Sequence, residues 1–236
     1  LEMMDKLAVQ AAEDFAHAGY PTQAEAILLC ELDGSHEEVL EQSILVKQQL
    51  QLNHAISIDE ADTPEQQAKL WAGRKSAFPA VGRISPDYYC MDGTIPRHQI
   101  AHVLARIGEL SEQFDLRVAN VFHAGDGNLH PLILYDANIT GELAKAEEFG
   151  AEILKLSVDV GGTITGEHGV GSEKIDQMCY QFTDAELAYF HAVKEAFDPD
   201  TILNPGKAVP TLHRCAELGQ MHVHNGELPH PELPRF

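Results

Sequence analysis

The segment His123-Ala-Gly-Asp-Gly-Asn-Leu-His130 decides the fold of this chain, because it predicts a β-hairpin with a histidine at each end. Asp126-Gly127 is a strong two-residue turn signal, and the flanking stretches 116–122 and 129–135 are rich in strand-forming residues. A turn at these two residues would pair the two histidines directly, with Cβ atoms roughly 5 Å apart on one face of the hairpin. Two neutral imidazoles at that separation can share one metal ion.

A second segment, Gly161 to Gly171, supplies a third ligand for such an ion. It holds five glycines around the adjacent pair Glu167-His168, and glycines let a backbone approach a ligand closely. Two imidazoles and one carboxylate leave coordination positions open for a substrate. We therefore predict a catalytic metal site at His123, His130 and Glu167, none of which has a cysteine near it in the sequence. Ordinary hydrogen-bonded histidines beside a plain loop are the alternative.

Asn128, inside the hairpin segment, is the next candidate, since its amide could point into the same site as a substrate-binding group. Its simpler interpretation is a turn former. The motif Trp71-Ala-Gly-Arg-Lys75 stands out because the protein has few cations. A guanidinium fork binds a carboxylate through two parallel hydrogen bonds, which makes Arg74 the first choice for holding an anionic substrate. A solvated surface arginine is the alternative.

Composition limits the possible partners. The 236 residues are 44% hydrophobic and 22% charged, which is typical of a soluble globular protein. The 16 basic and 37 acidic residues give a net charge of -21, which argues against nucleic acid and against docking on an anionic bilayer. No apolar run approaches the ~20 residues of a membrane helix, and no signal-peptide pattern is present. The sequence therefore predicts a cytoplasmic protein without a transmembrane segment.

Apolar runs alternate along the chain with amphipathic segments that carry helix-start signals. Leu1-Glu-Met-Met runs directly into helical sequence, and the tail after Asn204-Pro-Gly-Lys207 is too rich in proline for regular structure. Helices are predicted over 35–50, 63–75, 96–113, 141–158 and 183–197, strands over 26–32 and 55–58 in addition to the hairpin, and an extended segment over 88–95. This order predicts an α+β domain whose largely antiparallel sheet carries its helices on one face.

Five motifs occur together in a fixed order: Trp71 to Lys75, Asp87 to Pro96, Phe122 to Pro131, Thr165 to Gly171, and Leu203 to Lys207. In this combination the chain resembles the C-terminal half of the FAD-linked oxidases of the vanillyl-alcohol oxidase superfamily. The likeness is strongest to the flavin subunits of bacterial glycolate oxidases. D-lactate and D-2-hydroxyglutarate dehydrogenases share most of the same motifs.

The resemblance implies a division of the chain. Residues 1–160 would form a ferredoxin-like cap domain that supplies the substrate site. Residues 161–236 would pack on the cap and on an FAD-binding domain that is missing from this sequence. FAD would be held mainly by that missing domain, with Asn204 of the Asn-Pro-Gly-Lys turn lying against the flavin.

The resemblance also implies a reaction, the oxidation of glycolate or D-lactate to the 2-oxo acid. His123, His130 and Glu167 would bind a divalent metal, zinc, manganese or iron, and His168 would be the base. Arg74 would hold the substrate carboxylate. Cys90 stands where the D-2-hydroxyglutarate enzymes have a lysine that helps to hold the substrate. A small monocarboxylate is therefore favoured, with a D-2-hydroxyglutarate-type dehydrogenase as the alternative.

Partners follow from the same resemblance. It implies an oxidase complex with iron-sulfur subunits and a second flavin-type subunit, through which a cytoplasmic chain would attach peripherally to the inner membrane. Two functions of other classes stay open. One is a metal-dependent hydrolase that uses a metal-bound water, and the other is an assembly module without catalytic activity.

Overall fold

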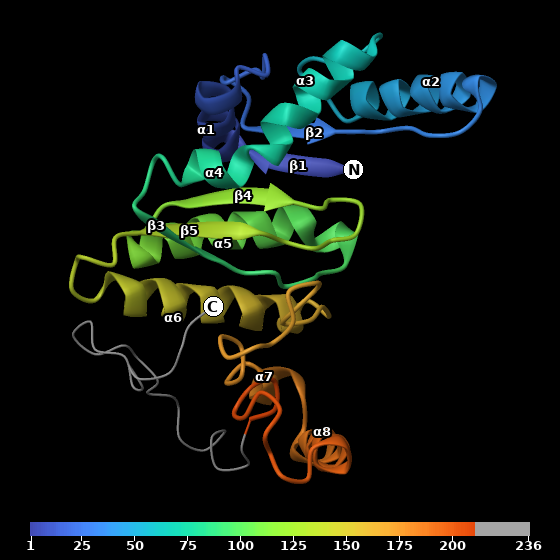
Figure 1. The fold of residues 1–236 in the computed structure, drawn as a ribbon. Coiled ribbons are helices and arrows are strands. Elements are labelled where there is room, and N and C mark those ends of the chain that lie inside the picture. The colour runs from blue at the N-terminus through green and yellow to red at the C-terminus, as the bar shows by residue number, and fades with distance from the viewer. Residues whose placement is uncertain (211–236) are drawn as a thin grey trace. The chain divides into compact units, whose positions relative to one another are not determined.

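The structure is a computed structural model, and it describes residues 1–210. The chain divides into two compact units, of which the first is Leu1–Glu167 and the second begins at His168. One five-stranded sheet lies in the first unit (Figure 1). Its strands are β1 (Glu2–Asp5), β2 (Ala26–Leu29), β3 (Asp87–Cys90), β4 (Val118–Phe122) and β5 (Pro131–Tyr135). They run in the order β2-β1-β4-β5-β3, with antiparallel neighbours throughout.

Four helices of the first unit lie where the sequence predicts them, over about 35–50, 63–75, 96–113 and 141–158, whereas the short helix at 77–81 was not predicted. The helices of this unit are α1 (Lys6–Ala16), α2 (His36–Leu52), α3 (Pro64–Lys75), α4 (Ala77–Val81), α5 (Ile100–Phe114), which a short 3-10 turn precedes (Arg97–Gln99), and α6 (Glu142–Asp159). The second unit contains α7 (Met178–Gln181) and α8 (Asp184–Phe197). Capping boxes begin α2, α3 and α8, as predicted, because each N-cap side chain accepts a hydrogen bond from the backbone three residues later.

Helices cover both faces of the sheet. On one face α1 and α4 pack against Met4, Val121 and Leu132, and on the other α5 and α6 pack against Phe122 and Ile133. The α+β class with its antiparallel sheet is confirmed, whereas the prediction that all helices lie on one face is wrong. The physical reason is that β4 and β5 carry apolar side chains on both of their faces, so that both faces need cover.

The first residues form an inner strand of the sheet, not the predicted start of a helix. β1 pairs with β2 on one side and with β4 on the other, which buries Met4. Asp5 then ends the strand and caps α1, because its Oδ1 accepts a hydrogen bond of 3.0 Å from the backbone nitrogen of Ala8. Its Oδ2 accepts two more from Asn120 on β4, at 2.9 and 2.7 Å. Burial raises the pKa of the Asp5 carboxyl above its usual range.

Two other predicted strands differ from the structure. The stretch 26–32 forms only the four-residue edge strand β2, which is half-exposed because it has a single neighbour. The predicted strand 55–58 is wrong, since residues 53–62 form an irregular connection in which Ile56 is 90% exposed. The apolar residues of this stretch predict a strand, but they carry no information on whether a neighbouring strand is there to pair with it.

Within residues 1–210, no helix combines the length and the hydropathy needed to cross a membrane. Most of the tail that the sequence predicts to lack regular structure, residues 211–236, lies outside the part of the chain that the structure describes.

Gly73, next to Arg74 on α3, gives a stability prediction. A Cβ at Gly73 would lie 2.4 Å from ring atom Cε2 of Tyr20, whose hydroxyl is tied to the carbonyl of Leu70. Burial raises the pKa of this tyrosine to about 12. Because the ring is held in place, Gly73→Ala should lower the free energy of unfolding by about 1–3 kcal/mol.

Gly108 provides the matched control. It lies on α5, and no atom lies within 4 Å of the position that a Cβ would take there. Gly108→Ala should therefore raise the free energy of unfolding by about 0.5–1 kcal/mol. Denaturant unfolding of both variants checks the pair. Equal stability changes at the two positions would contradict the close contact between Gly73 and Tyr20.

Candidate active site

The β4–β5 hairpin brings the two histidines together, but not in the predicted register. Its ladder pairs His123 with Asn128, so the loop has four residues, 124–127, and the predicted direct pairing of His123 with His130 is wrong. The shift is two residues. Since side chains alternate along a strand, both histidines stay on one face, and their ring centroids lie 5.1 Å apart.

Gly127 explains the longer loop. Its φ is +78°, and a Cβ at this position would lie 2.1 Å from the carbonyl oxygen of Ile95. The carbonyl of Gly127 in turn accepts a hydrogen bond of 2.9 Å from the backbone nitrogen of Ile95. The loop is therefore fixed by the segment that follows β3, which a local turn rule does not take into account.

His123, His130 and Glu167 converge on one point. Oε1 of Glu167 lies 2.9 Å from Nε2 of His130 and 3.7 Å from Nε2 of His123. Ligand atoms of all three residues lie within 4.8 Å of one another. Atoms bound tetrahedrally to zinc at about 2.1 Å would be roughly 3.4 Å apart. The donor set and its spacing therefore fit a divalent metal ion.

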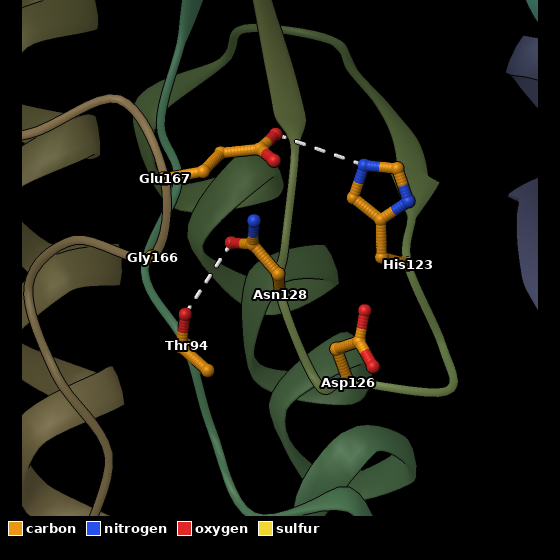
Figure 2. Close-up of a pocket in the computed structure, with 6 residues that line it drawn as sticks. All are labelled: Thr94, His123, Asp126, Asn128, Gly166 and Glu167. Carbon is orange, nitrogen blue, oxygen red and sulfur yellow. Dashed lines mark hydrogen bonds and ion pairs between the residues drawn. The ribbon is translucent and has the colours of Figure 1, made fainter.

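A pocket of about 350 Å³ opens beside these residues, and Figure 2 shows Glu167 and His123 facing each other across it. Thr94, His123, Asp126, Asn128, Gly166 and Glu167 line it. Asn128, predicted to point into the site, is thus at the pocket, where its Oδ1 accepts a hydrogen bond of 3.4 Å from Thr94 Oγ1. The volume is at the small end of the range for small-molecule sites.

Asp92, which sequence reasoning missed, holds the glycine-rich segment in place. It is fully buried, and its Oδ2 accepts hydrogen bonds from the backbone nitrogens of Gly166 and Glu167 at 3.2 and 3.0 Å. Gly166 fits only because it has no side chain, since a Cβ there would lie 2.5 Å from both Asn128 Oδ1 and Thr94 Oγ1. These contacts present Glu167 to the histidines. The one sequence signal for Asp92 was its place in the motif Asp87 to Pro96.

Arg74 is buried beside the site and is bound by Glu2, a second residue that sequence reasoning missed. Nε and Nη2 of Arg74 donate to Oε2 of Glu2 at 3.0 and 2.7 Å. The other oxygen of Glu2, Oε1, lies 2.9 Å from Nδ1 of His123. Arg74 is therefore connected to the histidines through Glu2, and it is not among the residues that line the pocket. Only the pairing of β1 with β4 reveals Glu2.

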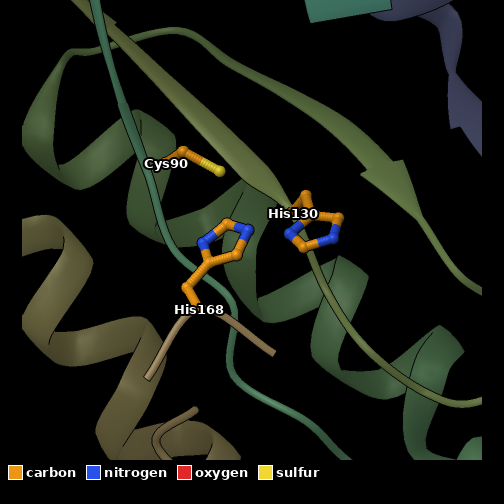
Figure 3. A group of neighbouring side chains, drawn as sticks. All are labelled: Cys90, His130 and His168. Atoms are coloured by element: carbon orange, nitrogen blue, oxygen red, sulfur yellow. The ribbon is translucent and has the colours of Figure 1, made fainter. Parts of the chain in front are cut away.

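Cys90 lies at the end of β3, close to His130 (Figure 3). Its Sγ is within 4.8 Å of a ring nitrogen of His130, so a cysteine remote in sequence does reach the site. The position where the resemblance places a substrate-binding lysine thus lies beside a predicted metal ligand. The fold, not the spacing along the chain, brings the two together.

Two predicted site residues belong to the second unit. His168 is exposed and follows Glu167 directly in the chain, as the first residue of that unit. Asn204 has a left-handed backbone with φ of 45°, and its carbonyl accepts a hydrogen bond from the backbone nitrogen of Lys207. The Asn-Pro-Gly-Lys sequence is therefore a tight turn, as its composition predicts.

Comparisons with known proteins point to one family. The glycolate oxidase subunit GlcD of Escherichia coli K12 is 64% identical over 236 residues, which are 100% of this chain and 47% of that protein. GlcD of Bacillus subtilis is 37% identical over 88% of this chain and 44% of its own. A D-lactate dehydrogenase of Anaerostipes hadrus is 34% identical over a match that covers 88% of this chain and 45% of that protein. The chain thus spans about half the length of these relatives.

Solved structures agree on the fold. The match to 4-ethylphenol oxidase from Gulosibacter chungangensis covers 90% of this chain and 48% of that chain. Its TM-score is 0.63 and the sequence identity is 14%. p-Cresol methylhydroxylase matches 90% with 47%, at a TM-score of 0.57. Residues 1–208 match the family described as FAD linked oxidases, C-terminal domain. The chain therefore belongs to the FAD-linked oxidases, as their C-terminal domain.

Proposed function

We propose that this chain is the substrate-binding, C-terminal portion of an FAD-dependent 2-hydroxy-acid oxidoreductase that oxidises glycolate or D-lactate to the 2-oxo acid. The observation that carries the proposal is the convergence of His123, His130 and Glu167 at one edge of the pocket. The relative named glycolate oxidase subunit, 64% identical over the whole chain, supports it. In this proposal residues 1–160 act as the cap domain, and 161–236 pack against it and against an FAD-binding domain.

The two histidines and the glutamate would hold a divalent metal, zinc, manganese or iron. When bound, such an ion supplies Lewis acidity toward the hydroxyl and carboxylate oxygens of a substrate. The structure favours this assignment because the three ligands come from two segments that separate contacts hold in place. The hairpin loop is tied to Ile95, and the glycine-rich segment is tied to Asp92.

His168 is proposed as the base that takes the proton from the substrate hydroxyl. An imidazole suits this role at neutral pH, and its place directly after Glu167 keeps it within one residue of a metal ligand. FAD, held mainly by a domain outside this sequence, would supply the hydride acceptor, with Asn204 against the flavin.

Arg74 is proposed to hold the substrate carboxylate, with the amide of Asn128 as a second contact. Nε and Nη2 of Arg74 are engaged by Glu2, whereas its Nη1 makes no hydrogen bond within residues 1–210. The guanidinium therefore keeps donors for a carboxylate while Glu2 fixes its orientation. Substrate binding would then use the side of the fork that faces away from Glu2.

Cys90 supports a small substrate. A thiol beside His130 offers no cation for a second carboxylate, so a monocarboxylate such as glycolate or D-lactate suits the site better than D-2-hydroxyglutarate. The relatives named as a subunit further suggest an oxidase complex, for which we propose iron-sulfur and second flavin-type partners. Such a complex would be cytoplasmic, with peripheral attachment to the inner membrane through those partners.

Flavin reduction tests this function in the protein that joins this chain to an FAD-binding domain. Glycolate and D-lactate should bleach the flavin absorbance, and D-2-hydroxyglutarate should act poorly. Cys90→Lys should raise kcat/KM for D-2-hydroxyglutarate relative to glycolate by about 10–150-fold, because a charged hydrogen bond is worth about 1.5–3 kcal/mol. Cys30→Lys, at an exposed cysteine, is the matched control. It should leave kcat/KM unchanged for both D-2-hydroxyglutarate and glycolate.

Reduction by none of the three acids would overturn the proposal. Hydrolysis of simple esters or phosphates by the same protein, lost in Glu167→Ala, would instead favour a metal-dependent hydrolase. The two outcomes are separable because only the first reaction changes the flavin absorbance.

A further inference from the structure

We propose that Glu2 is a positioning residue that selects the metal-binding tautomer of His123 and, with the same carboxylate, orients Arg74. The inference rests on the proposed metal site, whose ligands include His123. It assigns a role to a residue at the start of β1, remote in sequence from both groups that it contacts. Glu2 would contact neither substrate nor metal.

The sheet itself places Glu2 beside His123. β1 pairs with β4 so that Met3 lies opposite Phe122 and Met4 opposite Val121, which brings Glu2, at the start of β1, next to His123, directly after β4. The backbone nitrogen of Gly125 donates to the carbonyl of Leu1 at 3.0 Å, one residue out of that register, and this bond holds Leu1 against the hairpin loop. The contact is therefore set by strand pairing and not by a flexible surface side chain.

The two carboxylate oxygens of Glu2 have separate partners. Oε1 lies 2.9 Å from Nδ1 of His123, and Oε2 accepts both hydrogen bonds from Arg74, at 3.0 and 2.7 Å. The side chains of Glu2 and Arg74 are only 14% and 10% exposed, so water competes little for these bonds. One buried carboxylate thus links the metal-ligand histidine to the substrate arginine.

Hydrogen-bond chemistry then fixes the histidine. An ionised carboxylate can only accept, so Nδ1 of His123 donates to it, and in the neutral imidazole Nε2 then keeps its lone pair. It is Nε2 that faces Glu167, at 3.7 Å from Oε1. Metal-ligating histidines commonly donate their other ring nitrogen to a carboxylate in this way, and loss of that partner costs about 10–100-fold in metal affinity or activity.

Two measurements on the metal-free chain test the role of Glu2. The tautomer of His123 is read by ¹⁵N NMR, with its signals identified by their loss in His123→Asn, and Zn²⁺ affinity is read by competition with a chromophoric chelator. We expect the wild-type chain to hold the hydrogen on Nδ1. In Glu2→Gln the amide can donate or accept, so the preference should disappear and Zn²⁺ affinity should fall by about 10–100-fold.

Two control variants separate the contact between Glu2 and His123 from the general loss of an ion pair. Arg74→Gln breaks the ion pair between Arg74 and Glu2 but leaves the Glu2 carboxylate beside His123. The hydrogen should therefore stay on Nδ1 of His123, and the Zn²⁺ affinity should stay near the wild-type value. Glu25→Gln removes the carboxylate that pairs with Lys6 at 2.7 Å, near the same sheet, and should change neither measurement.

The outcomes are distinct. A wild-type His123 with its hydrogen on Nε2, or a Glu2→Gln chain that binds Zn²⁺ as tightly as the wild type, would overturn the inference while leaving the proposed metal site intact. An equal loss of affinity in Arg74→Gln would also overturn it, because the ion pair and not the contact to His123 would then be responsible. A wild-type chain that binds no metal would overturn the proposed function, and this inference with it.

Discussion

His168→Asn is expected to lower turnover of glycolate by about 10²–10⁴-fold, the usual contribution of a general base. Asparagine is close to histidine in shape at its polar end but cannot take up a proton at neutral pH. The metal ligands His123, His130 and Glu167 remain, so the variant should bind as much metal as the wild type. Steady-state kinetics and metal analysis on the same preparation measure both effects.

The matched control is His17→Asn. His17 is an exposed histidine at the end of α1, with a left-handed backbone of φ 50° that asparagine adopts readily. This variant should keep the turnover of the wild type. Unchanged turnover in His168→Asn would contradict the assignment of the base, and loss of metal together with turnover would show that His168 acts as a ligand.

Glu167→Ala and His123→Ala should each release the metal. Either change leaves two of the three protein ligands, so affinity should fall by more than the about 10–100-fold that loss of a supporting partner costs. The ligand lost in Glu167→Ala is the carboxylate whose Oε1 lies 2.9 Å from Nε2 of His130 and 3.7 Å from Nε2 of His123. Titration with Zn²⁺ against a competing chelator measures both affinities.

Asp126→Asn is the control for these two variants. Asp126 lines the same pocket and carries the same charge as Glu167, but it is not in the group of ligand atoms that meet. We expect its metal affinity to stay near the wild-type value. A comparable loss in Asp126→Asn would mean that the pocket attracts cations through its general negative charge and not through the three predicted ligands.

Local signals explain how much of the fold the sequence predicts. The capping boxes at Ser35, Thr63 and Thr183 start helices where the structure has them, because each cap is a contact between residues three apart. The placement of His123 and His130 on one face also follows from the alternation of side chains along the hairpin, although their direct pairing does not. Such features need no knowledge of the rest of the molecule.

Features that depend on contacts between residues far apart in the sequence are missed, because local signals do not show which segments meet. Glu2 reaches His123 only because β1 inserts beside β4, and Asp92 reaches Glu167 across 75 residues. The hairpin register is set by Gly127 against Ile95 and not by the turn alone. In each case the missing information is which strands and loops become neighbours, and periodicity does not supply it.

The metal content of the wild-type protein tests the account most directly. Purified without added metal and analysed by mass spectrometry, the protein that joins this chain to an FAD-binding domain should carry near-stoichiometric zinc, manganese or iron. The same analysis should find that metal absent from His123→Ala and Glu167→Ala. A wild-type protein that stays metal-free after incubation with each of the three ions would contradict the account.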